Sequence, residues 1–318
     1  MALERPIFVV GVHRSGTTLL RFMLNSHPRI YIPPESDFIP RFFGRDPGGE
    51  LSEKRIACLL DTIFGSYRFS KEWRDTPPRL DTFLQAMANR SPADFLETLY
   101  GLYAQQNAAL RWGDKTPIYA SYVDLIHQIL PHAQFIHIIR DGRDAALSML
   151  EKWGQREFHV DIYFAARNWV RRIRQAQASA EDLEPDQFYE LRYEYLVAHP
   201  EPALRSLCEF LDEPYHPDMA RHQLLGREQI PSGDFHDAVR KPPSTARIGR
   251  WQNEMSSRDQ RLFQRVAGSL LTELGYEVQD PGSMPAGELA RLSALAAKYE
   301  SLQTGRRVLQ SIGVVPPI

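Results

Sequence analysis

A glycine-rich segment near the start of the chain, Gly11–Thr18, has the residue types that bind anions. It reads Gly-Val-His-Arg-Ser-Gly-Thr-Thr and lies between an apolar run at 6–10 and an amphipathic stretch at 17–25. A strand, a glycine-rich turn and a helix in this order leave backbone N–H groups at a helix start, where the helix dipole favours negative charge. The guanidinium of Arg14 and two threonine hydroxyls add donors. The segment predicts a phosphate-type anion site, and the alternative is a turn that only starts a helix.

Thr17 distinguishes this segment from the ATP-binding P-loop, G-x-x-x-x-G-K-[ST], which has lysine at the corresponding position. Without that lysine, the loop lacks the point charge that serves the β- and γ-phosphates of a triphosphate. Arg14, earlier in the loop, supplies a different cation. A P-loop nucleotide kinase or hydrolase is the alternative function, and it would need both the lysine and a strand that ends in aspartate for magnesium.

A second strand-ending loop repeats this logic about 125 residues later. The apolar run Gln134–Ile139 predicts a buried strand that delivers Arg140 at its carboxyl end, and Ser148 follows on the early turns of the next expected helix. A long arginine and a helix hydroxyl can converge on one phosphate. We interpret Arg143 and Asp144 as an ion pair that supports the turn. The chain thus has two separate candidate phosphate sites.

Together the two loops resemble those of the 3′-phosphoadenosine 5′-phosphosulfate (PAPS)-dependent sulfotransferases, of the bacterial and tyrosylprotein types. The resemblance runs over roughly 6–278 and includes Gly-Asp-Lys-Thr-Pro at 113–117, Arg-Tyr-Glu-Tyr-Leu-Val at 192–197 and Arg-Trp at 250–251. It implies an enzyme that moves the sulfuryl group of PAPS to a hydroxyl, releases 3′,5′-bisphosphoadenosine (PAP) and requires no metal.

The resemblance also implies where the donor binds. The 5′-phosphosulfate is expected at the first loop, the 3′-phosphate at the second, and the rest of the nucleotide near three later residues. The implied donor-binding residues are Arg14, Ser15, Gly16, Thr17, Thr18, Arg140, Ser148, Tyr193, Lys241 and Arg250.

Three residues are candidates for catalysis. The acceptor hydroxyl must lose a proton as it attacks sulfur, so a base is required within hydrogen-bond reach. By resemblance that base is Glu35, in Pro-Pro-Glu-Ser-Asp-Phe-Ile-Pro-Arg at 33–41; the alternative is a cap of a helix that starts near Ser36. Lys115 is implied to assist the transferred group, and its alternative is a surface lysine. Arg14 is placed to stabilise charge on the leaving phosphate.

The elements that must position these residues indicate an α/β fold. Expected strands at 6–10, 30–32, 134–139 and 188–193 alternate with helices. This pattern predicts a P-loop-like parallel β-sheet flanked by helices on both faces, with ligands at the carboxyl ends of the strands. We expect a single domain over 1–280, with a helical acceptor-side subdomain at 38–110. A helical extension at 281–318 is expected to cover the acceptor site or to contribute to a homodimer.

Net charge, the length of apolar runs and the number of cysteines limit the classes of partner and the compartment that we expect. The net charge of the 318-residue chain is -2, which gives no field that points to nucleic acid. No apolar run reaches the roughly 20 residues that a membrane span needs. Cys58 and Cys208 are too few for a disulfide framework, so we expect a cytoplasmic protein.

The acceptor is expected to lie against residues 38–95 and 154–165. Their aromatic side chains could line a site for a small-molecule, lipid or glycoconjugate hydroxyl, or belong to the core. These aromatic and neighbouring residues are Phe42, Phe43, Tyr67, Phe69, Trp73, Trp153, Phe158, His159 and Tyr163.

Overall fold

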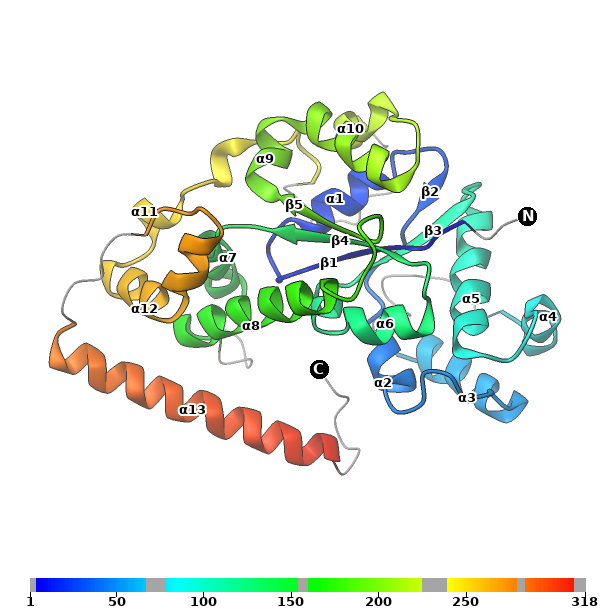
Figure 1. The fold of residues 1–318 in the computed structure, drawn as a ribbon, viewed down its shortest axis with the longest axis horizontal. Helices are drawn as coiled ribbons and strands as arrows, with labels where there is room; N and C mark the ends of the chain where they lie inside the picture. The colour runs from blue at the N-terminus through cyan, green and yellow to red at the C-terminus, as the bar shows by residue number, and fades with distance from the viewer. Residues whose placement is uncertain (1–3, 67–77, 154–159, 225–238, 279–283, 312–318) are drawn as a thin grey trace.

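The computed structural model describes residues 4–66, 78–153, 160–224, 239–278 and 284–311, and its centre is a five-stranded sheet (Figure 1). All pairings are parallel, in the order β2-β3-β1-β4-β5. The strands are β1 (Ile7–Gly11), β2 (Ile30–Tyr31), β3 (Arg111–Lys115), β4 (Gln134–Ile139) and β5 (Phe188–Arg192). The predicted α/β fold with a parallel sheet is confirmed.

Each face of the sheet has its own apolar core, because successive side chains of a strand point to opposite faces. On β1, Ile7 and Val9 pack with the helices α1, α9 and α10, whereas Phe8 and Val10 pack with α5, α6 and other helices of the opposite face. Figure 1 shows α1, α9 and α10 on one side of the sheet and α6 and α8 on the other. Helices therefore cover both faces, as predicted.

The helices follow the predicted pattern closely, although the stretch expected as one helix at 117–130 divides into two. The first half of the chain contains α1 (Thr17–Leu24), α2 (Ile39–Phe43), α3 (Glu53–Phe64), α4 (Leu80–Ala86), α5 (Pro92–Gln106), the 3-10 helix η2 (Pro117–Ser121) and α6 (Val123–Ile129). The second half contains α7 (Gly142–Trp153), α8 (Ile162–Ala180), α9 (Tyr193–Ala198), α10 (Pro200–Leu211), η3 (Pro217–Leu224), η4 (Thr245–Arg247), α11 (Trp251–Glu254), α12 (Ser257–Glu273) and α13 (Ala286–Ser311).

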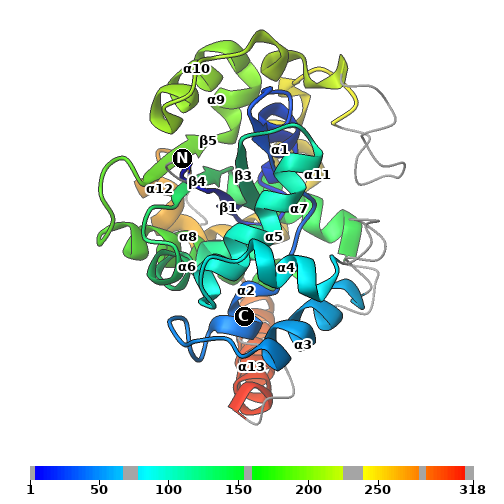
Figure 2. The same cartoon turned by 90° about the vertical axis from the view of Figure 1, so that its right-hand side faces the viewer.

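The helices α2–α5 gather beside one edge of the sheet (Figure 2). Phe43, Phe83 and Phe95 are almost fully buried among them, and they belong to the same apolar core as Phe8 of β1. The described part of the region expected to form a helical subdomain is therefore mainly helical, and its interior continues into the core of the sheet.

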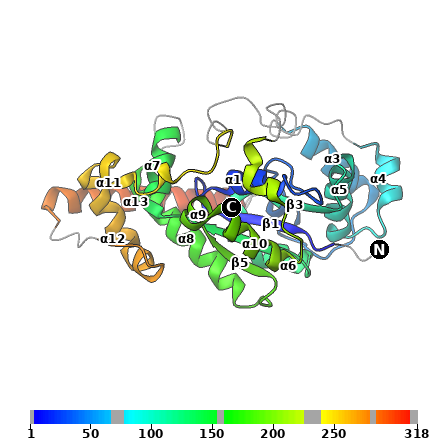
Figure 3. The same ribbon diagram turned by 90° about the horizontal axis from the view of Figure 1, so that it is seen from above.

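The C-terminal helix α13 contacts α8; it begins at the end of the molecule away from α3, α4 and α5 and runs back toward the middle (Figure 3). Tyr299 anchors it, with its ring centroid 5.8 Å from that of Tyr163 and 6.0 Å from that of Phe164. Among the helices that the structure describes, none combines the length and the apolar character needed to cross a bilayer.

Candidate active site

The first predicted loop follows the carboxyl end of β1 and starts α1 at Thr17. Arg14 has φ 71° and Gly16 has φ 97°, so the chain turns through two left-handed residues before the helix. A Cβ atom at Gly16 would lie 2.4 Å from Cδ2 of Tyr193, which leaves room for glycine alone. In the part of the chain that the structure describes, no side chain caps α1. Its first N–H groups therefore remain available to an anion.

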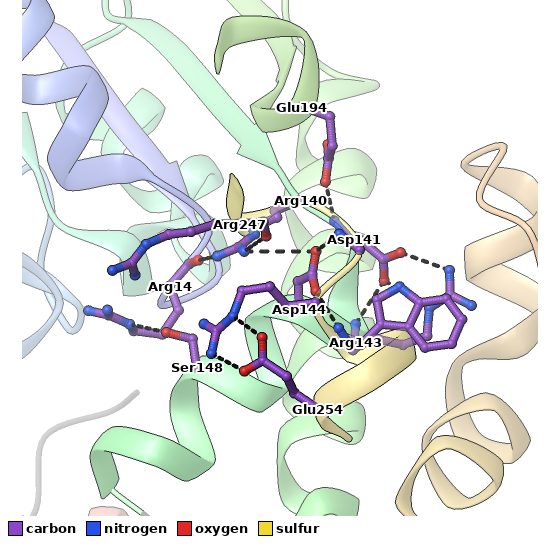
Figure 4. Close-up of polar contacts among 12 residues, drawn as sticks. Arg14, Arg140, Asp141, Arg143, Asp144, Ser148, Glu194, Arg247 and Glu254 are labelled. Carbon is purple, nitrogen blue, oxygen red and sulfur yellow. Dashed lines mark hydrogen bonds and ion pairs between the residues drawn. The ribbon is translucent and has the colours of Figure 1, made fainter. Parts of the chain in front are cut away.

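Arg140 connects this loop to a segment far along the chain. Its Nη1 donates to the carbonyl oxygen of Arg14 at 3.0 Å, and its Nη2 donates to that of Arg247 at 2.5 Å (Figure 4). The guanidinium carbon lies 4.6 Å from the centroid of the Tyr193 ring. Arg140 is almost fully buried, so these contacts fix its position at the carboxyl end of β4.

A cavity of about 420 Å³ opens between the two loops. Four cationic side chains and no carboxylate occur among the described residues that line it. The lining residues are Arg14, Gly16, Thr17, Thr18, Leu19, Arg140, Tyr193, Val197, Val239, Lys241, Pro242, Pro243, Ser244, Ala246 and Arg247. Its size falls within the usual range for small-molecule sites.

The electrostatics of this cavity favour an anion. Burial lowers the pKa of Arg14, and the neighbouring charges of Arg247 and Arg140 lower it further. Two buried polar atoms, Oγ of Ser15 and Nε of Arg140, have no hydrogen-bond partner among the described residues. Cations that repel one another and donors without acceptors both gain from a bound phosphate or sulfate.

Three of the predicted donor-binding residues, Ser15, Ser148 and Arg250, are not among the described residues that line the cavity. Ser148, on α7, accepts a hydrogen bond from Nε of Arg14 at 3.0 Å, and Lys241 lines the cavity. Arg250 is not among the lining residues; it pairs with Glu151 and with Glu254, each at 2.5 Å. These contacts raise its pKa, with the hydrogen bond to Glu254 as the largest cause.

Arg247 is a cavity residue that the sequence analysis missed. It lies three positions before Arg250 in a segment rich in glycine, proline and charge, where no periodic pattern distinguishes one arginine from the next. Asp144 fixes the position of this segment, because the Asp144 carboxylate accepts from the N–H groups of Gly249 at 2.7 Å and Trp251 at 3.0 Å.

The predicted ion pair between Arg143 and Asp144 is wrong, since Arg143 pairs instead with Asp141 at 2.7 Å.

Glu35 and Lys115 meet at the side of the cavity formed by Thr18. Nζ of Lys115 donates to Oε1 of Glu35 at 2.5 Å and to Oγ1 of Thr18 at 3.3 Å. Lys115 is 3% exposed, so it is not a surface lysine, and burial lowers its pKa while Glu35 raises it. Because α2 begins at Ile39 with Phe38 as its N-cap, Glu35 does not cap a helix.

The residues expected to face the acceptor are only partly described. Phe43 is buried in the core, and the ring of Trp153 meets that of His13, in the first loop, with centroids 5.4 Å apart. Tyr67, Phe69, Trp73, Phe158 and His159 lie outside the described residues.

Comparison with solved structures identifies the class of this fold. The chain is similar to the sulfotransferase domain of the Synechococcus PCC 7002 olefin synthase, with 21% identity, a TM-score of 0.59 and coverage of 88% of this chain and 98% of that one. It is also similar to a sulfotransferase domain of the curacin biosynthetic pathway, with 20% identity, a TM-score of 0.55 and coverage of 88% and 100%. The architecture is thus that of sulfotransferase domains.

Sequence comparison leads from the class to the family. The model of the Sulfotransferase family matches residues 6–217, and the chain belongs to this family. A protein-tyrosine sulfotransferase of Drosophila melanogaster is 26% identical over 86% of this chain, and protein-tyrosine sulfotransferase 1 of Danio rerio is 29% identical over 88%. The chain spans 52% of the length of the Drosophila protein and 73% of the Danio protein.

Proposed function

We propose that this protein transfers the sulfuryl group of PAPS to a hydroxyl group. The observation that carries the proposal is the cavity lined by four cationic side chains, those of Arg14, Arg140, Lys241 and Arg247. Thr18, which also lines it, accepts a hydrogen bond from Lys115 of the Glu35–Lys115 pair. PAPS has anionic groups at both ends, a 5′-phosphosulfate and a 3′-phosphate. Two cationic loops on one cavity suit such a donor better than either loop alone.

The donor is assigned to the cavity in two halves. The 5′-phosphosulfate lies over the first loop, against Arg14 and the N–H groups at the start of α1, and Ser15 supplies a hydroxyl that lacks a partner among the described residues. The 3′-phosphate lies at Arg140, with Ser148 close by. The apolar lining suits adenine, and we assign the cation of the later segment to Arg247 and Lys241, because Arg250 is held by two carboxylates.

The reaction follows from the remaining side chains. The acceptor oxygen attacks sulfur as the bond between sulfur and the 5′-phosphate oxygen breaks, and the acceptor proton passes to Glu35. Negative charge then grows on the leaving phosphate, where Arg14 stabilises it. Lys115 lies between Glu35 and Thr18 and is placed to neutralise the sulfuryl oxygens during transfer.

For the acceptor, we propose a hydroxyl of a small molecule, a lipid or a glycoconjugate. This proposal rests on the aromatic residues of the sequence around Glu35, among which Phe42 is half-buried beside Phe38, with ring centroids 6.0 Å apart. The names of the curated relatives favour a second candidate, a tyrosine hydroxyl. A transfer screen with labelled PAPS against small-molecule alcohols, phenols, saccharides and tyrosine peptides distinguishes the two.

Replacement of the proposed base tests the mechanism. Glu35→Gln keeps the shape of the side chain but removes its ability to accept a proton, so we expect the transfer rate to fall by about 10²- to 10⁴-fold. The affinity for PAP, measured by calorimetry, should stay close to that of the unaltered protein. A variant with full activity would exclude Glu35 as the base.

A further inference from the structure

Glu35 lies on a segment that has no secondary structure of its own. Residues 32–38 form neither helix nor strand between β2 and α2. A side chain that takes a proton must nevertheless be held in place, because displacement by about 1 Å can cost 10²-fold in rate. Its position must therefore come from contacts with the rest of the molecule.

Those contacts join two consecutive residues of the segment to three consecutive residues at the end of β3. Glu35 pairs with Lys115, while Oγ of Ser36 donates to Oδ2 of Asp114 at 2.6 Å. The backbone N–H of Ser36 donates to Oγ1 of Thr116 at 3.1 Å. Neighbouring side chains of a strand point to opposite faces, so Lys115 and Asp114 hold the segment from the two sides of the sheet.

Asp114 is the centre of a buried group of hydroxyls. Tyr100 donates to the same Oδ2 atom at 2.7 Å, and Asp114 has no exposed surface. Since the Ser36 proton goes to Asp114, the Tyr119 hydroxyl, 2.9 Å away, donates to Oγ of Ser36. That hydroxyl also accepts from the N–H of Ile39 at 3.1 Å, which extends the chain of hydrogen bonds to the first residue of α2.

A carboxylate at this place is costly to the fold. Burial raises the pKa of Asp114, and the hydroxyl groups of Ser36, Tyr100 and Thr116 offset only part of the loss of water. An apolar side chain would avoid the buried carboxylate, but it would leave the hydroxyl groups of Ser36 and Tyr100 without their acceptor. This carboxyl group is 0% exposed, lies one residue before Lys115 and binds Ser36, so it couples the end of β3 to the segment that carries Glu35.

We propose that Asp114 is a positioning residue, which fixes Glu35, and with it the Glu35–Lys115 pair, through the hydrogen bond that Asp114 accepts from Ser36. This inference rests on the proposed function of Glu35 and Lys115. The groups that act on the Lys115 ammonium are Glu35 and Asp114, which favour the charge, and Arg21 of α1, which opposes it. Asp114 thus offsets part of the effect of burial, while its hydrogen bonds orient the segment.

Asp114→Asn is the test, because it removes the charge and keeps the shape. The chain has only six lysines, so ¹³Cε-labelled lysine gives six NMR signals, and Lys115→Arg identifies the one of interest. Loss of a nearby negative charge should lower the pKa of Lys115 in the variant. The rate of PAP release from PAPS, with water as the acceptor, should fall by about 10²-fold. The affinity for PAP itself should change by less than about threefold, because Asp114 does not line the cavity.

Two further variants keep the result interpretable. Ile126→Val, in the same apolar core, removes one methylene group without touching the hydrogen bonds, and it should leave both the Lys115 titration and the rate unchanged. Tyr100→Phe removes one hydrogen bond to Asp114 and should move both quantities in the direction of Asp114→Asn, by less. If Asp114→Asn does not fold, Tyr100→Phe decides the matter.

The outcomes separate this inference from the proposed function. An unaltered Lys115 titration and an unaltered rate, in a folded Asp114→Asn or Tyr100→Phe variant, would overturn the role of Asp114. So would an equal loss of rate in Ile126→Val. Failure of the parent protein to bind PAP would instead overturn the proposed donor, and the Lys115 titration would still report whether Asp114 controls the lysine.

Discussion

Arg140 has two tasks at the scale of single residues. Its two Nη atoms tie the first loop to the segment around Arg247, and its Nε atom has no partner among the described residues. The two Nη hydrogen bonds shape the cavity before PAPS binds. The Nε–H group can then donate a hydrogen bond to a phosphate. The residue therefore contributes both preorganisation and charge to binding.

Arg140→Ala should weaken the binding of PAP by about 2–5 kcal/mol, because a buried charged contact with the ligand is lost. Isothermal calorimetry measures this loss directly. Arg250→Ala is the matched control, since its guanidinium is paired with Glu151 and Glu254 and does not line the cavity. Equal losses in the two variants would contradict the assignment of the 3′-phosphate to Arg140.

Gly16 is a single residue on which the junction of two elements depends, because it allows the chain to turn from β1 into α1 beneath Tyr193. Alanine at this position would need φ 97° and would bring Cβ to 2.4 Å from the Tyr193 ring. Strained backbone of this kind costs about 1–3 kcal/mol, and displacement of Tyr193 would also move Arg140. Gly16→Ala should therefore lower both the melting temperature and the affinity for PAP.

Gly101, inside α5, provides the contrasting variant for this experiment. No heavy atom lies within 4 Å of a Cβ built there, and the residue is helical. Gly101→Ala should raise stability by about 0.5–1 kcal/mol, because alanine loses less backbone entropy in a helix. A Gly16→Ala variant that is as stable and binds PAP as well as Gly101→Ala would refute the argument from Tyr193.

The elements also show where sequence reasoning succeeds and where it fails. The strands β1 and β4 are continuous apolar runs, and α5 begins and ends at the predicted residues, Pro92 and Gln106. The strand β3 was not predicted as one, because Arg-Trp-Gly-Asp-Lys contains three charged residues. They are buried through contacts with distant parts of the chain, such as the hydrogen bond from Arg111 to the carbonyl of Leu211, and no local pattern reports these contacts.

The same limit applies to the candidate site. Arg14, Arg140 and Lys115 stand at the ends of predicted elements or in recognisable motifs, so their residue types and positions indicated a role. Arg247 depends on Asp144, more than 100 residues earlier in the chain, for the position of its segment. The choice between Arg247 and Arg250 is therefore a property of the tertiary structure.

At the scale of the whole molecule, the cavity gathers cations from three separate parts of the chain. Arg14 follows β1, Arg140 follows β4, and Lys241 and Arg247 come from beyond the segment 6–217 that matches the family. The parallel order of the sheet brings the first two together, since β1 and β4 are neighbours with the same direction. The site therefore requires residues from both the matched segment and the later part of the chain.

The positive charge of the assembled cavity favours an anionic ligand that carries no metal ion. Thr17 stands where an ATP-binding loop has lysine, and Arg140, rather than a carboxylate for magnesium, follows the neighbouring strand β4. A ligand with phosphates at two ends and no bound metal can neutralise the four cationic side chains. A magnesium–triphosphate complex already contains a cation, so it suits this cavity less well.

Isothermal calorimetry with PAP and with ATP is the most direct test of this account. PAP should bind in the presence of EDTA, with an affinity that added magnesium does not increase, and it should bind more tightly than ATP with magnesium. Tighter binding of magnesium–ATP, or PAP binding that requires magnesium, would contradict the assignment of the cavity to a sulfuryl donor.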